Sequence, residues 1–143
     1  MGSNHQNRTI VAIFFLAFLL NFIWENLHSN LYLHYQDSPI TELVLLRATL
    51  FDAVFITLLS LLFLKFQYFR KRLWHALIIG LIAAIAIELY ALETGRWAYS
   101  DWMPIIPLLN TGLTPTIQLG VLAYIILKFI TRARPDLNRQ SSP

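Results

Sequence analysis

Charged and amide side chains interrupt the apolar stretches of this chain, and they are the residues best suited to do chemistry. The candidate site comprises Asn21, Glu25, His28, Arg47, Asp52, Glu88, Glu93, Arg96, Trp97, Tyr99 and Gln118. A charged side chain inside a bilayer costs roughly 2.5 to 3.5 kcal/mol even on lenient insertion scales. Several such groups in one chain therefore imply mutual pairing, contact with water, or a function.

The carboxyl groups in this set indicate proton transfer. A carboxylic acid in an apolar site keeps its proton more readily than in water and can act as a general acid. We expect Glu88 to be that acid, and Glu25 or Asp52 to be the base that removes a later proton. Arg47 would be their charge partner. The substrate-binding set would be Asn21, His28, Glu93, Arg96, Trp97, Tyr99 and Gln118.

Metal and cofactor sites are not expected. Glu25 and His28 have the E-x-x-H spacing that presents a carboxylate and an imidazole on one helix face in di-iron bundles, but those sites use two copies of the motif and this chain has one. His28 and His75 fall near opposite ends of different apolar segments, which disfavours a haem between them. The chain has no cysteine, Ser-His-Asp order or phosphate-binding glycine loop, so thiolate, hydrolase and NTPase sites are excluded.

The composition assigns the chain to a membrane. Hydrophobic residues make up 57% of it and its mean hydropathy is +0.56, which is far too apolar for a soluble domain of 143 residues. Lipid can solvate such a surface, so we expect one integral membrane domain with the bilayer as its partner. The basic residues flank apolar stretches and no base-reading motif is present, so nucleic acid is not an expected partner.

Four apolar segments are each long enough to cross a bilayer, at about 20 residues per helix. They cover residues 10–28, 43–64, 74–92 and 115–131. Prolines and glycines between residues 102 and 116 forbid a continuous helix there. The predicted fold is an all-α, integral membrane four-helix bundle with a Pro/Gly-broken segment between the third and fourth helices and a disordered polar tail at 132–143.

Helical periodicity predicts which faces point inward. Asn21, Glu25 and His28 are spaced i, i+4 and i+7, so they share one face, which should point into the protein. Glu88 should also face protein, because its stripe carries the small residues that allow close helix packing in lipid. These small residues are Gly80, Ala84 and Ala91.

The basic residues predict an orientation. If both termini and the 65–72 link are cytoplasmic, nine of the eleven Lys and Arg residues lie inside and only Arg47 and Arg96 lie outside. This pattern is typical of a protein of the cell inner membrane with cytoplasmic N and C termini. At about 1.5 Å per helical residue, all four spans then bring polar groups to a similar depth in the outer half. These groups are Glu25, Asp52, Glu88 and Gln118.

A structural interpretation of the same residues stays open. In it, Arg47 neutralises Asp52 or Glu88. Arg96 pairs with Glu93, and the amides close a network that fixes the helix register. Acids outnumber bases by seven to two in the outer half, so some acids lack a cationic partner within the chain.

Aromatic residues cluster in the two links on that outer side. Trp97, Tyr99 and Trp102 lie in one link, and Tyr32 and Tyr35 lie in the other. They are typical of an interfacial aromatic belt. Alternatively, they line the mouth of a pocket for a flat or polyene ligand and stabilise cationic intermediates with their faces.

The stretch from Glu88 to Gln118 resembles the signature of the small lycopene cyclase domain. The matching positions are Glu88, Gly95, Arg96, Trp97, Tyr99, Pro104, Pro107, Gly112, Leu113, Thr114, Pro115 and Gln118. The resemblance covers about a quarter of the chain and implies cofactor-independent, proton-initiated cyclisation of an isoprenoid end group in the membrane. Gln118 stands where that family has an acid, so here the acid would come from Glu88, Glu25 or Asp52.

Three function classes follow. The first is an acid–base cyclase or isomerase that acts on an apolar isoprenoid or lipid-like molecule. The second is a structural or assembly partner, as a homo-oligomer or with another membrane protein, for which only packing faces such as Gly80 and Ala84 are needed. The third is a small proton-coupled transporter, which the strong charge asymmetry and the off-centre site disfavour.

Overall fold

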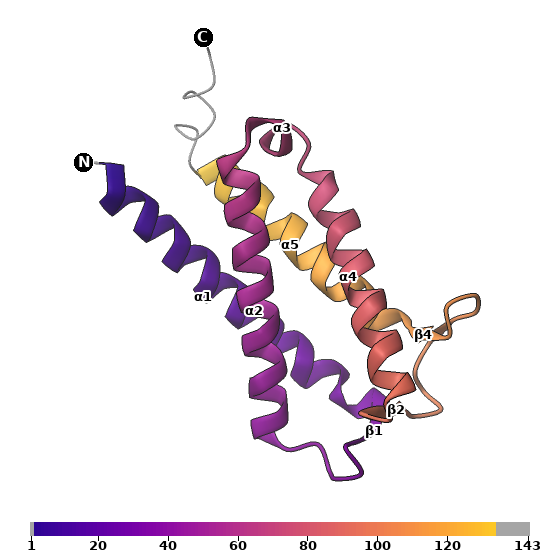
Figure 1. Ribbon diagram of the computed structural model, residues 1–143. Coiled ribbons are helices and arrows are strands. Elements are labelled where there is room, and N and C mark those ends of the chain that lie inside the picture. The colour runs from indigo at the N-terminus through magenta and orange to yellow at the C-terminus, as the bar shows by residue number, and fades with distance from the viewer. Residues whose placement is uncertain (1, 134–143) are drawn as a thin grey trace.

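The computed structural model describes residues 2–133, with side chains from residue 6 onward, and consists mainly of four long helices (Figure 1). These helices are α1 (Gly2–His28), α2 (Glu42–Lys65), α4 (Trp74–Glu93) and α5 (Leu113–Ala133). All four are long and apolar enough to cross a membrane, which fits an integral membrane protein. The prediction of four apolar helices is confirmed.

The helix bounds differ from the predicted segments at their ends. α1 begins earlier than residue 10, since polar residues continue its first turns. α5 continues through Arg132 and Ala133, which the sequence assigns to a disordered tail. The remainder of that predicted tail, 134–143, lies outside the described residues.

Short elements connect the helices of this mainly helical chain, and they include strands that the sequence did not predict. A short 3₁₀ helix η1 (Ser29–Leu31) leads into β1 (Tyr32–Tyr35), and α3 (Gln67–Arg70) follows α2. The predicted Pro/Gly-broken segment between α4 and α5 is not helical, but it contains strands β2 (Trp97–Tyr99), β3 (Ile105–Ile106) and β4 (Thr111–Gly112). β3 and β4 form a small antiparallel pair of their own.

Strands β1 and β2 join the two links at one end of the molecule. They pair antiparallel, with Tyr32 opposite Tyr99 and Tyr35 opposite Trp97. In Figure 1 this pair lies at the lower end, whereas the start of α1, α3 and the end of α5 lie at the upper end. We call these the β1–β2 end and the α3 end. Sequence patterns do not predict these strands, because their partners are far apart in the chain and each strand is too short for a periodic pattern.

The helices pack as two close pairs joined through α1 and α5. α1 packs on α2 and α4 packs on α5, while α2 and α4 contact each other little. The core includes Ile13, Ala17, Ala53, Ile56, Phe63, Ala84, Leu122, Ala123, Ile126 and Leu127. Large apolar side chains such as Phe15, Leu58 and Ile82 lie on the outer surface, as expected for helices solvated by lipid.

Glycines allow the backbones of α4 and α5 to touch. A Cβ atom placed on Gly80 would lie 2.4 Å from the Cα of Gly120, and one placed on Gly120 would lie 2.5 Å from the carbonyl oxygen of Leu77. Such distances are far below van der Waals contact, so neither position can accept a side chain unless the helices separate. The predicted stripe is confirmed, since Gly80, Ala84, Glu88 and Ala91 are all buried.

Gly80→Ala should destabilise the protein, because the added methyl group overlaps backbone atoms of α5 that cannot rotate away. Overpacking of this kind costs about 1–3 kcal/mol. The midpoint of thermal unfolding in detergent, followed by size-exclusion chromatography after heating, should fall. Ala86→Val, on the exposed face of the same helix, is the matched control and should change little. Equal midpoints for Gly80→Ala and wild type would show that the α4–α5 contact is not a close one.

Candidate functional site

A pocket of about 340 Å³ lies between α2 and α4 near the β1–β2 end. We call it the α2–α4 pocket. Much of its wall is apolar and comes from Ile40, Val44, Leu45, Ala48, Phe51, Ala84, Ile87 and Leu119. Its polar lining includes three carboxyl groups, from Glu25, Asp52 and Glu88, which three different helices contribute. The volume falls in the range of sites that bind small molecules.

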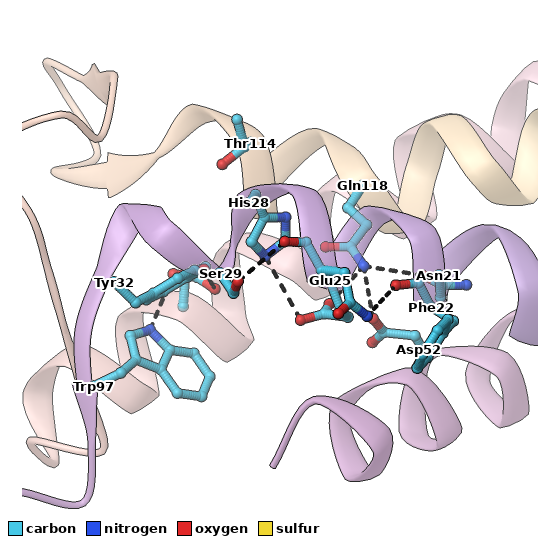
Figure 2. A network of polar contacts seen from close by, with 12 residues as sticks. Asn21, Phe22, Glu25, His28, Ser29, Tyr32, Asp52, Trp97, Thr114 and Gln118 are labelled. Atoms are coloured by element: carbon cyan, nitrogen blue, oxygen red, sulfur yellow. Dashed lines mark hydrogen bonds and ion pairs between the residues drawn. The ribbon is translucent and has the colours of Figure 1, made fainter. Parts of the chain in front are cut away.

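One amide group connects three of the helices beside this pocket. Nε2 of Gln118 on α5 lies 3.0 Å from Oδ1 of Asn21, 2.7 Å from Oε1 of Glu25 and 2.9 Å from Oδ2 of Asp52. Figure 2 shows this amide facing all three side chains. We call these four residues the Gln118 cluster. An amide nitrogen carries two hydrogens for three acceptors, so the acceptors share the available donors.

The local helix geometry explains how the Gln118 cluster forms. Asn21, Glu25 and His28 are buried, as their shared helix face predicted. The Asn21 side-chain nitrogen donates to the carbonyl oxygen of Ala17 at 2.8 Å, which turns its own oxygen toward Gln118. Asn21 is therefore held from within α1 before it contacts α5.

His28 ends α1 and reaches the pocket from the side of the β1–β2 end. Its Nε2 lies 3.6 Å from Oε2 of Glu25, and its side chain packs near the ring of Tyr32 at 5.6 Å between centroids. The residue is only 6% exposed, yet Nδ1 has no hydrogen-bond partner among the described residues.

Glu88 forms a second polar group with the aromatic residues of β1 and β2. Its Oε2 accepts hydrogen bonds from Nε1 of Trp97, at 3.3 Å, and from the hydroxyl of Tyr99. Its Oε1 lies 3.5 Å from the hydroxyl of Tyr32. The Tyr99 hydroxyl in turn accepts from the backbone N–H of Gly112 at 2.8 Å. We call Glu88, Tyr32, Trp97 and Tyr99 the Glu88 group.

The register of β1 and β2 assembles this second group. Because Tyr32 pairs with Tyr99, both hydroxyl groups converge on the end of α4, where Glu88 is 4% exposed. Burial raises the pKa of Tyr32 well above its usual range, and the neighbouring Glu88 carboxyl raises it further. Burial likewise raises the pKa of Tyr99, together with its hydrogen bond to Glu88. Both phenols therefore remain protonated donors.

The two arginines do not pair with the acids in the way the structural interpretation required. Within residues 6–133, no ion pair joins Arg47 to Asp52 or Glu88, and none joins Arg96 to Glu93. Arg47 and Arg96 are exposed and line the pocket, and the Arg96 guanidinium lies 5.3 Å from the ring centre of Tyr90. Glu93 is exposed and does not line the pocket, so the structure does not bring it to the other candidate residues.

Two contributors to the site are not evident from the sequence. Tyr32 is expected there only in an aromatic belt or pocket mouth, and its contact with Glu88 depends on strand pairing. The backbone N–H of Gly112 carries no side-chain signal, although Pro115 and Met103 enclose its Cα so closely that a Cβ would lie 2.8 Å from the Met103 sulfur. Trp102, expected in the same belt as Trp97, is 84% exposed and takes no part in the site.

The arrangement is suited to proton transfer. It places proton donors and acceptors on two sides of one small apolar space, within reach of a molecule bound between them. Among the described residues, no group of three or more His, Cys, Asp or Glu side chains is arranged to hold a metal ion.

Comparisons with protein-family models, with curated proteins and with solved structures give no match to this chain.

Gln118→Leu should destabilise the protein, because it removes the donor from three acceptors, of which Asn21 and Glu25 are buried and Asp52 is partly buried. An unsatisfied buried polar group costs about 1–3 kcal/mol, and more when it is charged. Thermal unfolding should show a lower midpoint. The control is Thr114→Val, on the same helix as Gln118, which removes only a 3.5 Å contact from Thr114 to the Met103 sulfur and should have a smaller effect. Adding Asp52→Asn to Gln118→Leu should recover part of the loss, since the new amide can donate to Glu25. No recovery would show that the loss arises from packing.

Stability should fall as the pH rises above about 10, the ordinary tyrosine pKa. Tyr32 and Tyr99 have raised pKa values in the folded protein, so at that pH the unfolded chain loses protons that the folded chain keeps. The unfolded state is then favoured, by up to about 1.4 kcal/mol per pH unit for each group. Unfolding midpoints measured from pH 8 to 11 should drop less in the double variant Tyr32→Phe, Tyr99→Phe. If the midpoints of wild type and the double variant fall by the same amount between pH 8 and 11, the two tyrosines are not the source of the pH dependence.

Proposed function

We propose that this protein is a cofactor-independent, integral membrane acid–base catalyst that isomerises or cyclises an isoprenoid or lipid-like alkene. The observation that carries the proposal is the convergence of Glu25, Asp52 and Glu88, from three helices, on one pocket with a largely apolar wall. None of the three carboxyl groups has a Lys or Arg ion-pair partner in the described part of the chain. Acids held in this way are available for proton transfer to an apolar molecule.

The position of the pocket supports a substrate that arrives from the bilayer. α2 and α4 contact each other little, and residues of both helices line the space between them. Phe51 of α2 is 56% exposed and also lines the pocket, so the apolar wall continues to the outer surface. A hydrocarbon chain could pass between these helices without crossing water.

The hydrogen bonds suggest which carboxyl groups give and which receive the proton. Glu25 and Asp52 share one amide of Gln118, and two carboxylates at such close range repel each other in a medium of low dielectric. The pair is thus best suited to hold a shared proton and donate it. Glu88 faces the Trp97 and Tyr99 donors, which stabilise a carboxylate, so we assign it the role of base. This reverses the roles expected from the sequence.

The reaction would use these groups in order. An O–H bond of the Glu25–Asp52 pair breaks as its proton bonds to one alkene carbon, which uses the π electron pair and leaves a carbocation at the other carbon. In a cyclisation, a second alkene of the same molecule then supplies its π pair to that cation. Glu88 removes a proton from a carbon next to the final cation, and the C–H electron pair becomes a new double bond. Proton exchange with water restores the starting state, and the composition of the substrate is unchanged.

Aromatic rings line the pocket in which a positive charge would develop. Tyr32 and Trp97 both line the pocket, and their rings meet edge to face with 6.0 Å between centroids. Ring faces attract cations, most strongly that of Trp, and the effect grows where water is excluded. Figure 2 shows the Trp97 indole and Tyr32 beside each other, next to the end of α1.

Incorporation of solvent deuterium tests the proposal for any prenyl lipid that the protein accepts. Purified protein in nanodiscs made from host membrane lipids is incubated in D₂O, and prenyl lipids are analysed by mass spectrometry. Protonation from an exchangeable carboxyl group should add deuterium to an alkene carbon. Asp52→Asn and Glu88→Gln should each lower the rate at least about 100-fold, which is the scale of general acid–base catalysis. Asp101→Asn, at an exposed acid outside the pocket, should keep the wild-type rate of deuterium incorporation.

The same experiment separates catalysis from a purely structural role. If wild type adds no deuterium to any lipid, while Asp52→Asn and Glu88→Gln only lower the unfolding midpoint, the carboxyl groups hold helices together and the proposal is wrong. The contact of Gln118 with α1 and α2 gives that alternative a physical basis.

A further inference from the structure

Two arginines line the rim of the α2–α4 pocket, and they are unusual in where they lie. Most Lys and Arg side chains in residues 6–133 lie toward the α3 end, including those of the 65–72 link. Arg47, near the start of α2, and Arg96, just after α4, lie toward the β1–β2 end. Both line the same pocket although they come from different elements. The cations of this end are therefore gathered at one site.

The acids of this end do not neutralise the two arginines. Asp37, Glu42, Glu93 and Asp101 are all exposed, and none of them lines the pocket. The described residues form no ion pair with Arg47 or Arg96. A guanidinium group carries five N–H donors in a planar fork that fits carboxylate and phosphate oxygens. The rim thus presents donors and positive charge without an internal counter-ion.

A second polar feature lies on the same side of the pocket. Nδ1 of His28 is buried without a partner in the described part of the chain, and His28 lines the pocket at the end of α1. A pure hydrocarbon would offer no acceptor to the two exposed guanidinium groups, of which that of Arg96 lies over the Tyr90 ring. A ligand with oxygen atoms at one end would accept hydrogen bonds from both.

The carboxyl groups and part of the apolar wall lie deeper than the rim. Asp52 follows Arg47 by five residues on α2, which places it about 7.5 Å farther along the helix axis. Arginine side chains in membrane helices extend toward the interface, which increases this separation. The pocket is thus cationic at the membrane surface, apolar along its wall and acidic at depth.

We infer that the α2–α4 pocket binds a single-chain amphiphile whose anionic head group, a phosphate or carboxylate, is held between Arg47 and Arg96 while its chain lies against Ala48, Phe51 and Ile87. The inference deepens the proposed function, on which its choice of an alkene chain rests, and narrows the substrate class from a neutral hydrocarbon to an anionic amphiphile. The alkene that receives a proton would lie at least about 7.5 Å from the head group, at the depth of Asp52.

Binding of matched probes tests this inference independently of catalysis. Farnesyl phosphate and farnesol carry the same chain and differ in the charge of the head group. Their dissociation constants are measured with the protein in phosphatidylcholine nanodiscs, and binding to nanodiscs without protein is subtracted. Wild type should bind farnesyl phosphate at least about tenfold more tightly than farnesol, as expected for charge-assisted hydrogen bonds. Inorganic phosphate, which lacks the chain, should bind far more weakly.

The variants identify the groups responsible for this preference. Arg47→Gln and Arg96→Gln should each reduce the preference for the phosphate about fivefold, and together abolish it, without changing the affinity for farnesol. Arg132→Gln, at an exposed arginine near the α3 end, should leave both affinities unchanged. Equal binding of the two probes to wild type, or a preference that survives the double variant, would overturn the inference.

Two further measurements complete the test. The first shows whether the anion bound at the rim comes from a bilayer lipid or from a single-chain ligand, and the second distinguishes failure of this inference from failure of the proposed function. If nanodiscs that contain phosphatidylglycerol weaken the binding of farnesyl phosphate to wild type but not to the double arginine variant, the rim binds head groups of bilayer lipids. If they have no effect, the site is selective for the single-chain anion. Asp52→Asn should keep the preference for the phosphate while it loses deuterium incorporation. If wild type prefers farnesyl phosphate to farnesol but incorporates no deuterium, the binding site is supported and the proposed chemistry is wrong.

Discussion

The hydrogen bonds of one amide group to acceptors on two other helices determine how the helices of this protein fit together. Gln118 brings its Nε2 within 3.0 Å of groups on α1 and α2, and so connects α5 to both. In a lipid-solvated protein the helices gain little from burying apolar surface against one another, because the lipid is equally apolar. Polar contacts and close packing must therefore define how the helices fit together.

Close packing and polar contact act in different places, and the pocket results from that difference. At Gly80 and Gly120 the backbones of α4 and α5 touch, which fixes one pair of helices. The Gln118 cluster ties α5 to α1 and α2, but α2 and α4 share few contacts of their own. The space between these two helices remains open to a ligand, and carboxyl groups face it from both sides.

In the structure the arginines and the buried carboxyl groups have separate partners, whereas the sequence suggested that they pair with each other. Arg47 was expected to neutralise acids in the membrane, but it lines the rim of the pocket, while Asp52 turns to the amide of Gln118. Amides and phenols, not cations, satisfy the buried carboxyl groups. This solution leaves the positive charge at the surface, where a guanidinium group retains contact with water or an anion, and avoids the desolvation that a buried ion pair requires.

The four apolar helices, the inward face of Asn21, Glu25 and His28, the buried stripe of Glu88 and the broken segment before α5 could all be predicted from the amino-acid sequence. These features depend on hydrophobicity, helical periodicity and proline geometry within short windows. The sequence also predicts that Glu25, Asp52, Glu88 and Gln118 lie at a similar depth. The sequence could not predict that Gln118 bridges two acids, that Tyr32 joins Tyr99 at Glu88, or that Glu93 lies outside the pocket. These outcomes depend on the rotation of each helix against its neighbours and on pairing between strands about 60 residues apart, which no local pattern encodes.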